Sequence, residues 1–251
     1  MNNVFSKLPQ ITISFWIMKI CATTLGETAG DLLAQTMKVG YAVSSAILLC
    51  FFFVMLGIQL FSKKYHPIIY WAVILATSTA GTTMSDFMDR TLGLGYATGS
   101  LILVTLLILT LISWQATEKS LSVTDIKSLK GEIFYWTAIL FSNTLGTALG
   151  DFLADNSGLG FSGGAILIGS LLLLIIFAYY FTKISHIILF WLAFVLTRPF
   201  GATFGDLLTK PLVKGGLNFG TIGSSAILFA ILIILVFIDI RRQKTRKMYY
   251  S

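Results

Sequence analysis

Residues 16–31 read WIMKICATTLGETAGD, and this stretch decides the fold because its pattern occurs four times in the chain. In each copy a tryptophan is followed ten residues later by a glycine and fifteen residues later by an aspartate. Spacing this regular indicates internal repeats. The four sets are Trp16/Gly26/Asp31, Trp71/Gly81/Asp86, Trp136/Gly146/Asp151 and Trp191/Gly201/Asp206.

The composition around these sets is that of a membrane protein. Of the 251 residues, 56% are hydrophobic and 12% are charged, whereas a soluble domain carries roughly a quarter charged residues. Apolar runs of about 18 residues match the thickness of a bilayer core. They are continuous rather than alternating, which favours helices over a β-barrel. The sequence therefore predicts an all-α integral membrane protein.

Each repeat reads as two helices, so eight transmembrane helices are predicted. The first and third repeats match at an offset of 120 residues, as in Thr24-Leu25-Gly26 and Thr144-Leu145-Gly146. This offset indicates that a two-repeat unit was duplicated. The predicted organisation is a first membrane half, 1–115, with repeats 11–61 and 67–115; a cytoplasmic linker, 116–131; a second half, 132–240, with repeats 132–182 and 187–240; and a basic tail, 241–251.

Lysine and arginine are distributed unevenly between the two ends of the predicted helices. One side carries Lys7, Lys63, Lys64, Lys119, Lys127, Lys130, Lys183, Arg241, Arg242, Lys244, Arg246 and Lys247. The other side carries only Lys38, Arg90, Lys210 and Lys214. This asymmetry predicts that both termini are cytoplasmic, in a bacterial inner membrane. The four repeats are then parallel, with pseudo-two-fold (approximately four-fold) symmetry about the membrane normal.

The four aspartates are the candidate site. An ionisable group inside a membrane span costs about 2.5–3.5 kcal/mol and rarely faces lipid. Asp31, Asp86, Asp151 and Asp206 are therefore expected to converge on an acidic vestibule, with Glu27 one turn deeper than Asp31. Together with the polar side chains of Thr24, Thr79, Thr144 and Asn143, they would line a cation or proton pathway. The four aspartates would be ligands for a hard divalent ion such as Mg²⁺ or Mn²⁺.

A structural interpretation of the same residues stays open. The aspartates can cap helix ends, or pair with Lys19 and Arg198 to hold the bundle together. A cation this deep needs a partner, and Glu27 and the aspartates are the nearest acidic candidates. Lys19 and Arg198 are therefore charge partners or a gate. Pro199 predicts a local kink or break next to Arg198, and the tryptophans of the repeats are expected to be interfacial anchors.

Small residues precede each aspartate and favour close packing of the first helices of the repeats. The alternative is a loosened helix whose carbonyls line a cavity. The small residues with the required spacing are Gly26 and Gly30, Gly81 and Ser85, Gly146 and Gly150, and Gly201 and Gly205.

Four tandem two-helix repeats with a tryptophan and Gly-x-x-x-Gly-Asp resemble a family of bacterial membrane proteins described only as a repeat of unknown function. The resemblance covers about residues 11–240, and it implies no settled activity. Repeat two departs from the glycine pattern at Ser85. Repeat four departs from it with Pro199 and with extra residues at 214–218.

The leading hypothesis is a secondary transporter for a small cation, expected to be a divalent metal coupled to protons. The alternatives are a passive pore along the symmetry axis and a membrane scaffold without transport activity. No nucleophile motif, P-loop or HExxH occurs, so the chain is not predicted to be an enzyme. Its predicted partners are the lipid bilayer and the cation. Neither a cofactor nor nucleic acid is expected, and the pattern fixes no oligomeric state.

Overall fold

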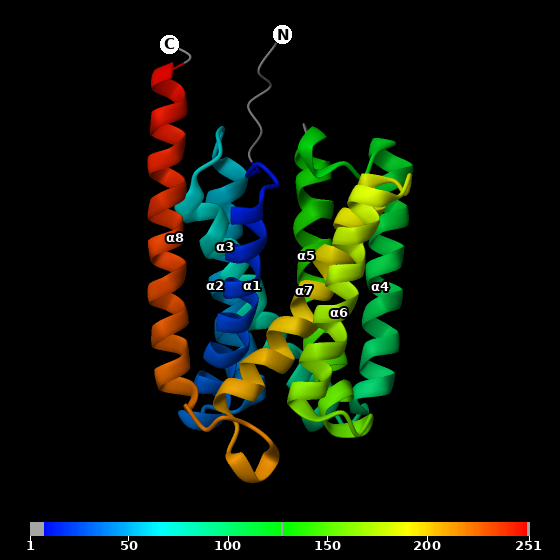
Figure 1. The fold of residues 1–251 in the computed structure, drawn as a ribbon, viewed down its shortest axis with the longest axis vertical. Coiled ribbons are helices and arrows are strands. Elements are labelled where there is room, and N and C mark those ends of the chain that lie inside the picture. Colours follow the sequence, from blue (N-terminus) through cyan, green and yellow to red (C-terminus); the bar gives the residue numbers. More distant parts are fainter. Residues whose placement is uncertain (1–7, 127, 250–251) are drawn as a thin grey trace.

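The computed structural model describes residues 8–126 and 128–249, except the side chains of residue 125 and residues 244–249. The described residues thus exclude Lys7 and Lys127. They also exclude residues 250–251 of the predicted basic tail and the side chains just before them. The described chain forms one helical bundle in which α1 begins and α8 ends at the same end (Figure 1). The predicted all-α architecture is confirmed. The helices are α1 (Ile13–Asp31), α2 (Tyr41–Phe61), α3 (Pro67–Asp86), α4 (Gly95–Glu118), α5 (Leu129–Asp151), α6 (Gly160–Phe181), α7 (His186–Thr209) and α8 (Thr221–Tyr249).

The first helices of the four repeats form a closed inner ring. Helix α1 contacts α3 and α7, and α5 contacts the same two helices from the other side. Each outer helix packs mainly on the inner helix that follows it: α2 on α3, α4 on α5 and α6 on α7. The last helix, α8, completes this order by packing on α1. Consequently 72% of the apolar stretch of α3 with its π turn is buried, whereas only 17% of the apolar stretch of α2 is buried.

Glycines allow the inner helices to approach one another closely. A Cβ atom at Gly30 would lie 2.8 Å from Cβ of Thr82 on α3, and one at Gly150 would lie 2.8 Å from Cβ of Ala202 on α7. Gly205 lies against Glu27 in the same way and closes the ring from α7 to α1. This is the packing role that the small-residue spacing predicts. Gly26, Gly81, Gly146 and Gly201 likewise face the next inner helix.

Three of the four inner helices end in a π-helical turn, which the sequence analysis does not anticipate. These turns directly follow the aspartates and comprise η1 (Leu32–Thr36), η2 (Phe87–Thr91) and η4 (Phe152–Asn156). Helix α7 instead stays α-helical to Thr209 and is followed by Lys210 in an extended conformation. It also continues through Pro199, so of the predicted kink or break there, a break is excluded. The fourth repeat therefore presents the residues after its aspartate differently from the other three.

The loop that follows each inner helix ends on a glycine with positive φ. The four residues occupy equivalent repeat positions and have φ values of 82° (Gly40), 72° (Gly95), 68° (Gly160) and 72° (Gly220). Only glycine adopts this conformation without steric cost. The glycines therefore make the tight turn from each inner helix into an outer one.

Six of the helices in the described chain are long and apolar enough to cross a membrane: α2, α3 with its π turn, α4, α6, α7 and α8. Outer helices expose large apolar side chains, such as Ile166 at 70% and Leu173 at 67%. Helices α1 and α5 are of similar length but contain more polar residues, including buried Glu27 and Glu132. The helices thus indicate a multi-pass membrane protein.

Aromatic side chains fill the inner ring at the end where the inner helices begin. We call Tyr70, Trp71, Tyr135, Trp136 and Trp191 the aromatic layer. Trp71, Trp136 and Trp191 are at most 6% exposed. Trp136 lies 5.6 Å from Tyr70, and Tyr135 lies 6.5 Å from Trp191, between ring centroids. The prediction of interfacial anchors is therefore wrong for these three tryptophans, because they are buried and face the bundle. Trp16 is half-buried beside Phe15.

Candidate functional site

The four aspartates lie at the far ends of the inner helices, and each is at most 4% exposed. Each is followed four residues later by the same repeat position, which holds Gln35, Arg90, Asp155 or Lys210. In a helix these two positions share one face. The position is cationic in two repeats, and these two cations divide the four aspartates into two pairs.

The first pair is held by Arg90. Its Nε atom lies 2.9 Å from Asp86 Oδ1, and its Nη2 atom lies 2.9 Å from Asp151 Oδ2. The guanidinium carbon lies 6.0 Å from the ring centroid of Tyr41 and 5.7 Å from that of Tyr96. We call these five residues the Arg90 clamp. A guanidinium that pairs with two carboxylates and lies near two aromatic rings stays permanently charged.

The second pair is held by Lys210. Its Nζ atom lies 2.6 Å from Asp31 Oδ2 and 3.1 Å from Asp206 Oδ1. Burial works against its charge, but the carboxylates of Asp206 and Asp31 outweigh burial and raise the pKa of Lys210 above its ordinary value. We call these three residues the Lys210 clamp. Gln35 supports it by donating from Nε2 to Asp31 Oδ1.

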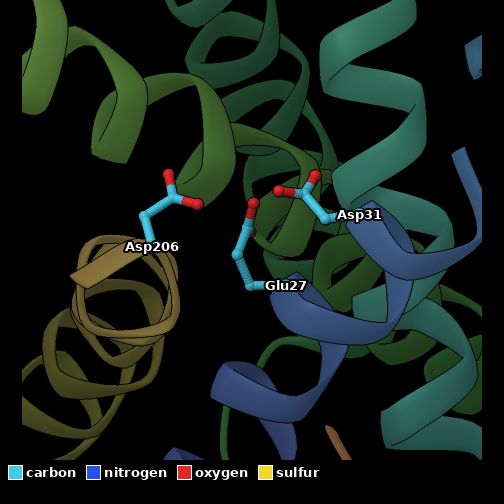
Figure 2. Close-up of side chains that lie close together, drawn as sticks. All are labelled: Glu27, Asp31 and Asp206. Carbon is cyan, nitrogen blue, oxygen red and sulfur yellow. The ribbon is translucent and has the colours of Figure 1, made fainter. Parts of the chain in front are cut away.

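A group of three carboxylates lies at the Lys210 clamp. One oxygen each of Glu27, Asp31 and Asp206 lies within 4.8 Å of the other two, and all three residues are buried. Figure 2 shows Glu27 and Asp31 on α1 pointing toward Asp206 of α7. We call these residues the carboxylate triad. It differs from the predicted metal set, because Asp86 and Asp151 belong to the Arg90 clamp and Glu27 takes part instead.

Arg198 lies beneath the triad at the centre of the inner ring. It is fully buried, and its Nη1 atom lies 3.0 Å from Glu27 Oε2. Its Nη2 atom donates to Thr82 Oγ1 at 2.5 Å and to Thr147 Oγ1 at 2.6 Å. Both threonines donate in turn to Glu27 Oε2. One oxygen of Glu27 thus joins all four inner helices, while a carboxylate has a second oxygen with which to ligate a cation.

Lys19 departs from the expected pairing with a carboxylate. Its Nζ atom lies 3.4 Å from Asn143 Oδ1 and 3.9 Å from the ring centroid of Phe194. In the part of the chain that the structure describes, no carboxylate lies within 4.0 Å of Lys19. Asn143 also donates to Thr77 Oγ1 at 2.8 Å. Asn143 of α5 therefore bonds both to Lys19 of α1 and to Thr77 of α3, nearer the start of the inner helices than the carboxylates are.

The predicted threonines bond to their own helices and not to the carboxylates. Thr24, Thr79 and Thr144 donate to carbonyl groups of their own helices at 2.9, 3.0 and 2.9 Å, respectively. Such bonds satisfy a hydroxyl without any ligand. The threonines that do reach the site are Thr82 and Thr147, the repeat equivalents of Glu27. Ser85, a predicted packing residue, is buried and donates to Asp89 Oδ2.

The charges within the two clamps do not cancel. Arg90 and Lys210 face four aspartates, which leaves a formal charge of −2 when all the carboxylates are ionised. Glu27 and Arg198 cancel each other beneath them. A buried excess of negative charge favours the binding of cations or protons. One divalent cation or two protons would balance it.

From the sequence, Arg90 and Lys210 are predicted only as loop charges that set topology. The available signal was their spacing, since each follows an aspartate of its own helix by four residues. The second aspartate of each pair comes from another repeat and has no local sequence signal.

A family model described as "Repeat of Unknown Function (DUF347)" matches the chain four times, over residues 14–65, 69–120, 134–185 and 189–245. Each match covers most of one inner helix and most or all of the outer helix that follows it. No curated protein and no solved structure is detectably similar to the chain.

Proposed function

The chain belongs to the family of the Repeat of Unknown Function (DUF347), and we propose that it is a secondary transporter that exchanges a small divalent cation for protons. The observation that carries this proposal is the carboxylate triad, three buried carboxylates from two inner helices with oxygens within 4.8 Å of one another. A hard divalent cation is held by oxygen ligands at about 2.0–2.6 Å. Oxygens this close together can close around such an ion, and Mn²⁺ and Mg²⁺ are the candidates of matching chemistry.

The proposed topology has eight membrane-spanning helices and cytoplasmic termini, in a bacterial inner membrane. Helices α1 and α5 lie in one ring with α3 and α7, so all four would cross together. The loop residues Lys63, Lys119 and Lys183 follow outer helices, on the same side as the start of α1. Basic loops favour the cytoplasm. The cyclic packing order of the outer helices supports pseudo-two-fold, approximately four-fold, symmetry about the membrane normal.

Lys210 provides the exchange mechanism in this proposal. Its ammonium group neutralises part of the triad when no metal is bound, and its side chain is 18% exposed. A divalent cation that enters between Asp31 and Asp206 would displace the ammonium toward solvent. Proton binding to the carboxylates would weaken the site and release the metal. Lysine suits this role because it is a point charge on a flexible stem.

A passive pore along the axis of the ring is less favoured. The aromatic layer closes one end of the axis, and Arg198 with its partners fills the centre. An open channel would need both to move aside at once. Alternating access asks only that each be rearranged in turn.

The test uses the purified protein in proteoliposomes with an acidic interior, and Mn²⁺ as the probe. Internal dyes report Mn²⁺ entry and proton release. We expect Asp31→Asn and Asp206→Asn to lower the initial Mn²⁺ flux by at least about tenfold. The control is Asp155→Asn, an exposed carboxylate at the repeat position that follows Asp151 by four residues.

Wild-type flux in both triad variants would refute the assignment. Flux that does not saturate and moves no protons would support the pore instead. Absence of any cation flux, with assembly defects in the same variants, would support a scaffold.

A further inference from the structure

We propose that a groove between α2 and α3 binds an anionic phospholipid at the basic end of the bundle. This inference is independent of the proposed transport activity. It rests on the shape of the groove, on one glycine within it, and on the charges at its end.

The groove has a volume of about 610 Å³ and runs between the end of α2 and the start of α3. Its sides are apolar, and large side chains along it are exposed, including Phe53 at 59% and Phe61 at 89%. An apolar groove of this size on the lipid-facing side of a membrane helix fits an acyl chain. We call it the α2–α3 groove, and it is lined by Phe53, Gly57, Ile58, Phe61, His66 and Ile69.

Gly57 keeps the α2–α3 groove open. A Cβ atom at Gly57 would meet no other atom within 4 Å, so helix packing does not require glycine there. Glycine is also disfavoured in a helix interior relative to alanine. At the equivalent position of the duplicated half stands Phe177, whose ring stacks on Phe181 at 4.4 Å between centroids. The two halves therefore differ by a whole aromatic side chain at the centre of this groove.

The groove ends among positive charges. Ser62 and His66 line its end, and the residues between them include the exposed Lys63 and Lys64. Helix α3 begins at Pro67, and the N-cap residue, His66, makes no capping hydrogen bond with its side chain. The start of a helix carries partial positive charge and favours phosphate groups. The nearby acidic residue Asp239 already accepts hydrogen bonds from Tyr65 and Gln243.

An apolar groove that leads to paired lysines and a helix N-terminus matches the two parts of an anionic phospholipid, its acyl chain and its charged headgroup. Free phosphate would occupy only the basic end and leave the apolar part of the α2–α3 groove empty. A second copy of this chain would need to present an acidic group beside an apolar ridge. The combination of charge and shape therefore favours the lipid.

The experiment is native mass spectrometry of the purified full-length protein in detergent with added phosphatidylglycerol or phosphatidylcholine. We expect retention of phosphatidylglycerol in preference to phosphatidylcholine. Gly57→Phe, which copies the duplicated half, should weaken phosphatidylglycerol binding about tenfold by displacing acyl-chain contacts. Lys63→Gln and Lys64→Gln should each weaken it about fivefold, since a basic residue near an anionic headgroup contributes about that factor.

The control is Ile176→Phe, which adds an exposed ring to α6, outside the groove, and should bind phosphatidylglycerol like the wild type. Equal retention of the two lipids, or wild-type retention by Gly57→Phe, overturns the proposal. Competition by inorganic phosphate alone that removes the lipid completely also overturns it, because the acyl chain would then contribute nothing. If the wild type shows a dimer peak and Gly57→Phe loses it, the groove is a site of self-association instead. If Gly57→Phe does not fold, the two lysine variants still decide the outcome.

Discussion

The Arg90 clamp and the Lys210 clamp occupy equivalent repeat positions, yet their surroundings differ. Arg90 lies in a π-helical turn, near the rings of Tyr41 and Tyr96, and bridges Asp86 and Asp151. Lys210 follows an uninterrupted α-helix and bridges Asp31 and Asp206, with a third carboxylate, Glu27, beside them. The difference teaches that one repeated framework holds two kinds of charge site. In the proposed mechanism, Arg90 stays in place as a fixed cation, whereas a metal ion replaces Lys210.

The largest effect is expected at the buried ion pair of Arg198 and Glu27, at the centre of the inner ring. Arg198→Ala leaves Glu27 charged and buried with no cation beside it, so the free energy of unfolding should fall by about 3–5 kcal/mol. Chemical unfolding in detergent measures it. Arg242→Ala, at an exposed arginine that bonds Ser14, is the control and should change stability by less than about 0.5 kcal/mol.

A double variant sharpens this prediction. Glu27→Thr with Arg198→Asn installs residues that other repeats carry at these positions, Thr82 and Asn143. Removing both charges together costs far less than removing one. The double variant should therefore be more stable than Arg198→Ala. Equal destabilisation of the two would show that the pair contributes packing and not charge balance.

The Lys210 clamp should respond to exchange of its cation. Lys210→Arg keeps the positive charge but replaces a flexible point charge by a planar group that binds two carboxylates firmly. Mn²⁺ should then compete poorly, with an apparent affinity lower by about tenfold, while stability is maintained. Flux measured against Mn²⁺ concentration reports this, and an unchanged half-saturation point would argue against displacement of Lys210.

The Arg90 clamp should show the opposite behaviour. Arg90→Lys loses the two nitrogens with which the guanidinium reaches two carboxylates and weakens its cation–π contacts with Tyr41 and Tyr96, so stability should fall by about 1–2 kcal/mol. Mn²⁺ affinity should stay close to the wild-type value because the carboxylate triad is untouched. Thermal unfolding and flux measured on the same preparation separate the two effects. A large loss of affinity without loss of stability would reverse the roles of the clamps.

The smallest effect is expected from one ring of the Arg90 clamp. Tyr41→Leu removes a cation–π contact and a hydrogen bond from Arg90, at 3.3 Å to the hydroxyl. A contact of this kind contributes about 0.5–1 kcal/mol when partly exposed. Unfolding midpoints of Tyr41→Leu and Tyr41→Phe distinguish the ring from the hydroxyl. If Tyr41→Phe loses as much as Tyr41→Leu, the hydrogen bond is the main contribution.

Local sequence signals predicted much of the framework. Continuous apolar runs and fixed offsets predicted the helices and the repeats, and the spacing of Gly26 and Gly30 predicted close helix contacts. The sequence did not predict which residues the charged side chains pair with. Asp31 and Asp206 come from the first and last repeats, and only closure of the ring brings both to Lys210.

The tryptophans show a different limit of the sequence. A tryptophan near a helix end has the same local pattern whether it faces lipid or the bundle. Trp136 faces the bundle because the inner ring, covered by outer helices, leaves it no lipid surface. The π-helical turns at the ends of α1, α3 and α5 likewise have no local sequence pattern that predicts them.

The most direct test of the account is to measure Mn²⁺ binding to the purified protein by titration calorimetry. Each of the four clamp aspartates is replaced in turn. The account predicts that Asp31→Asn and Asp206→Asn lose high-affinity binding, whereas Asp86→Asn and Asp151→Asn retain it. Asp155→Asn is the matched control. Loss of binding in the Arg90 clamp variants with retention in the Lys210 clamp variants would contradict the account, as would equal loss in all four.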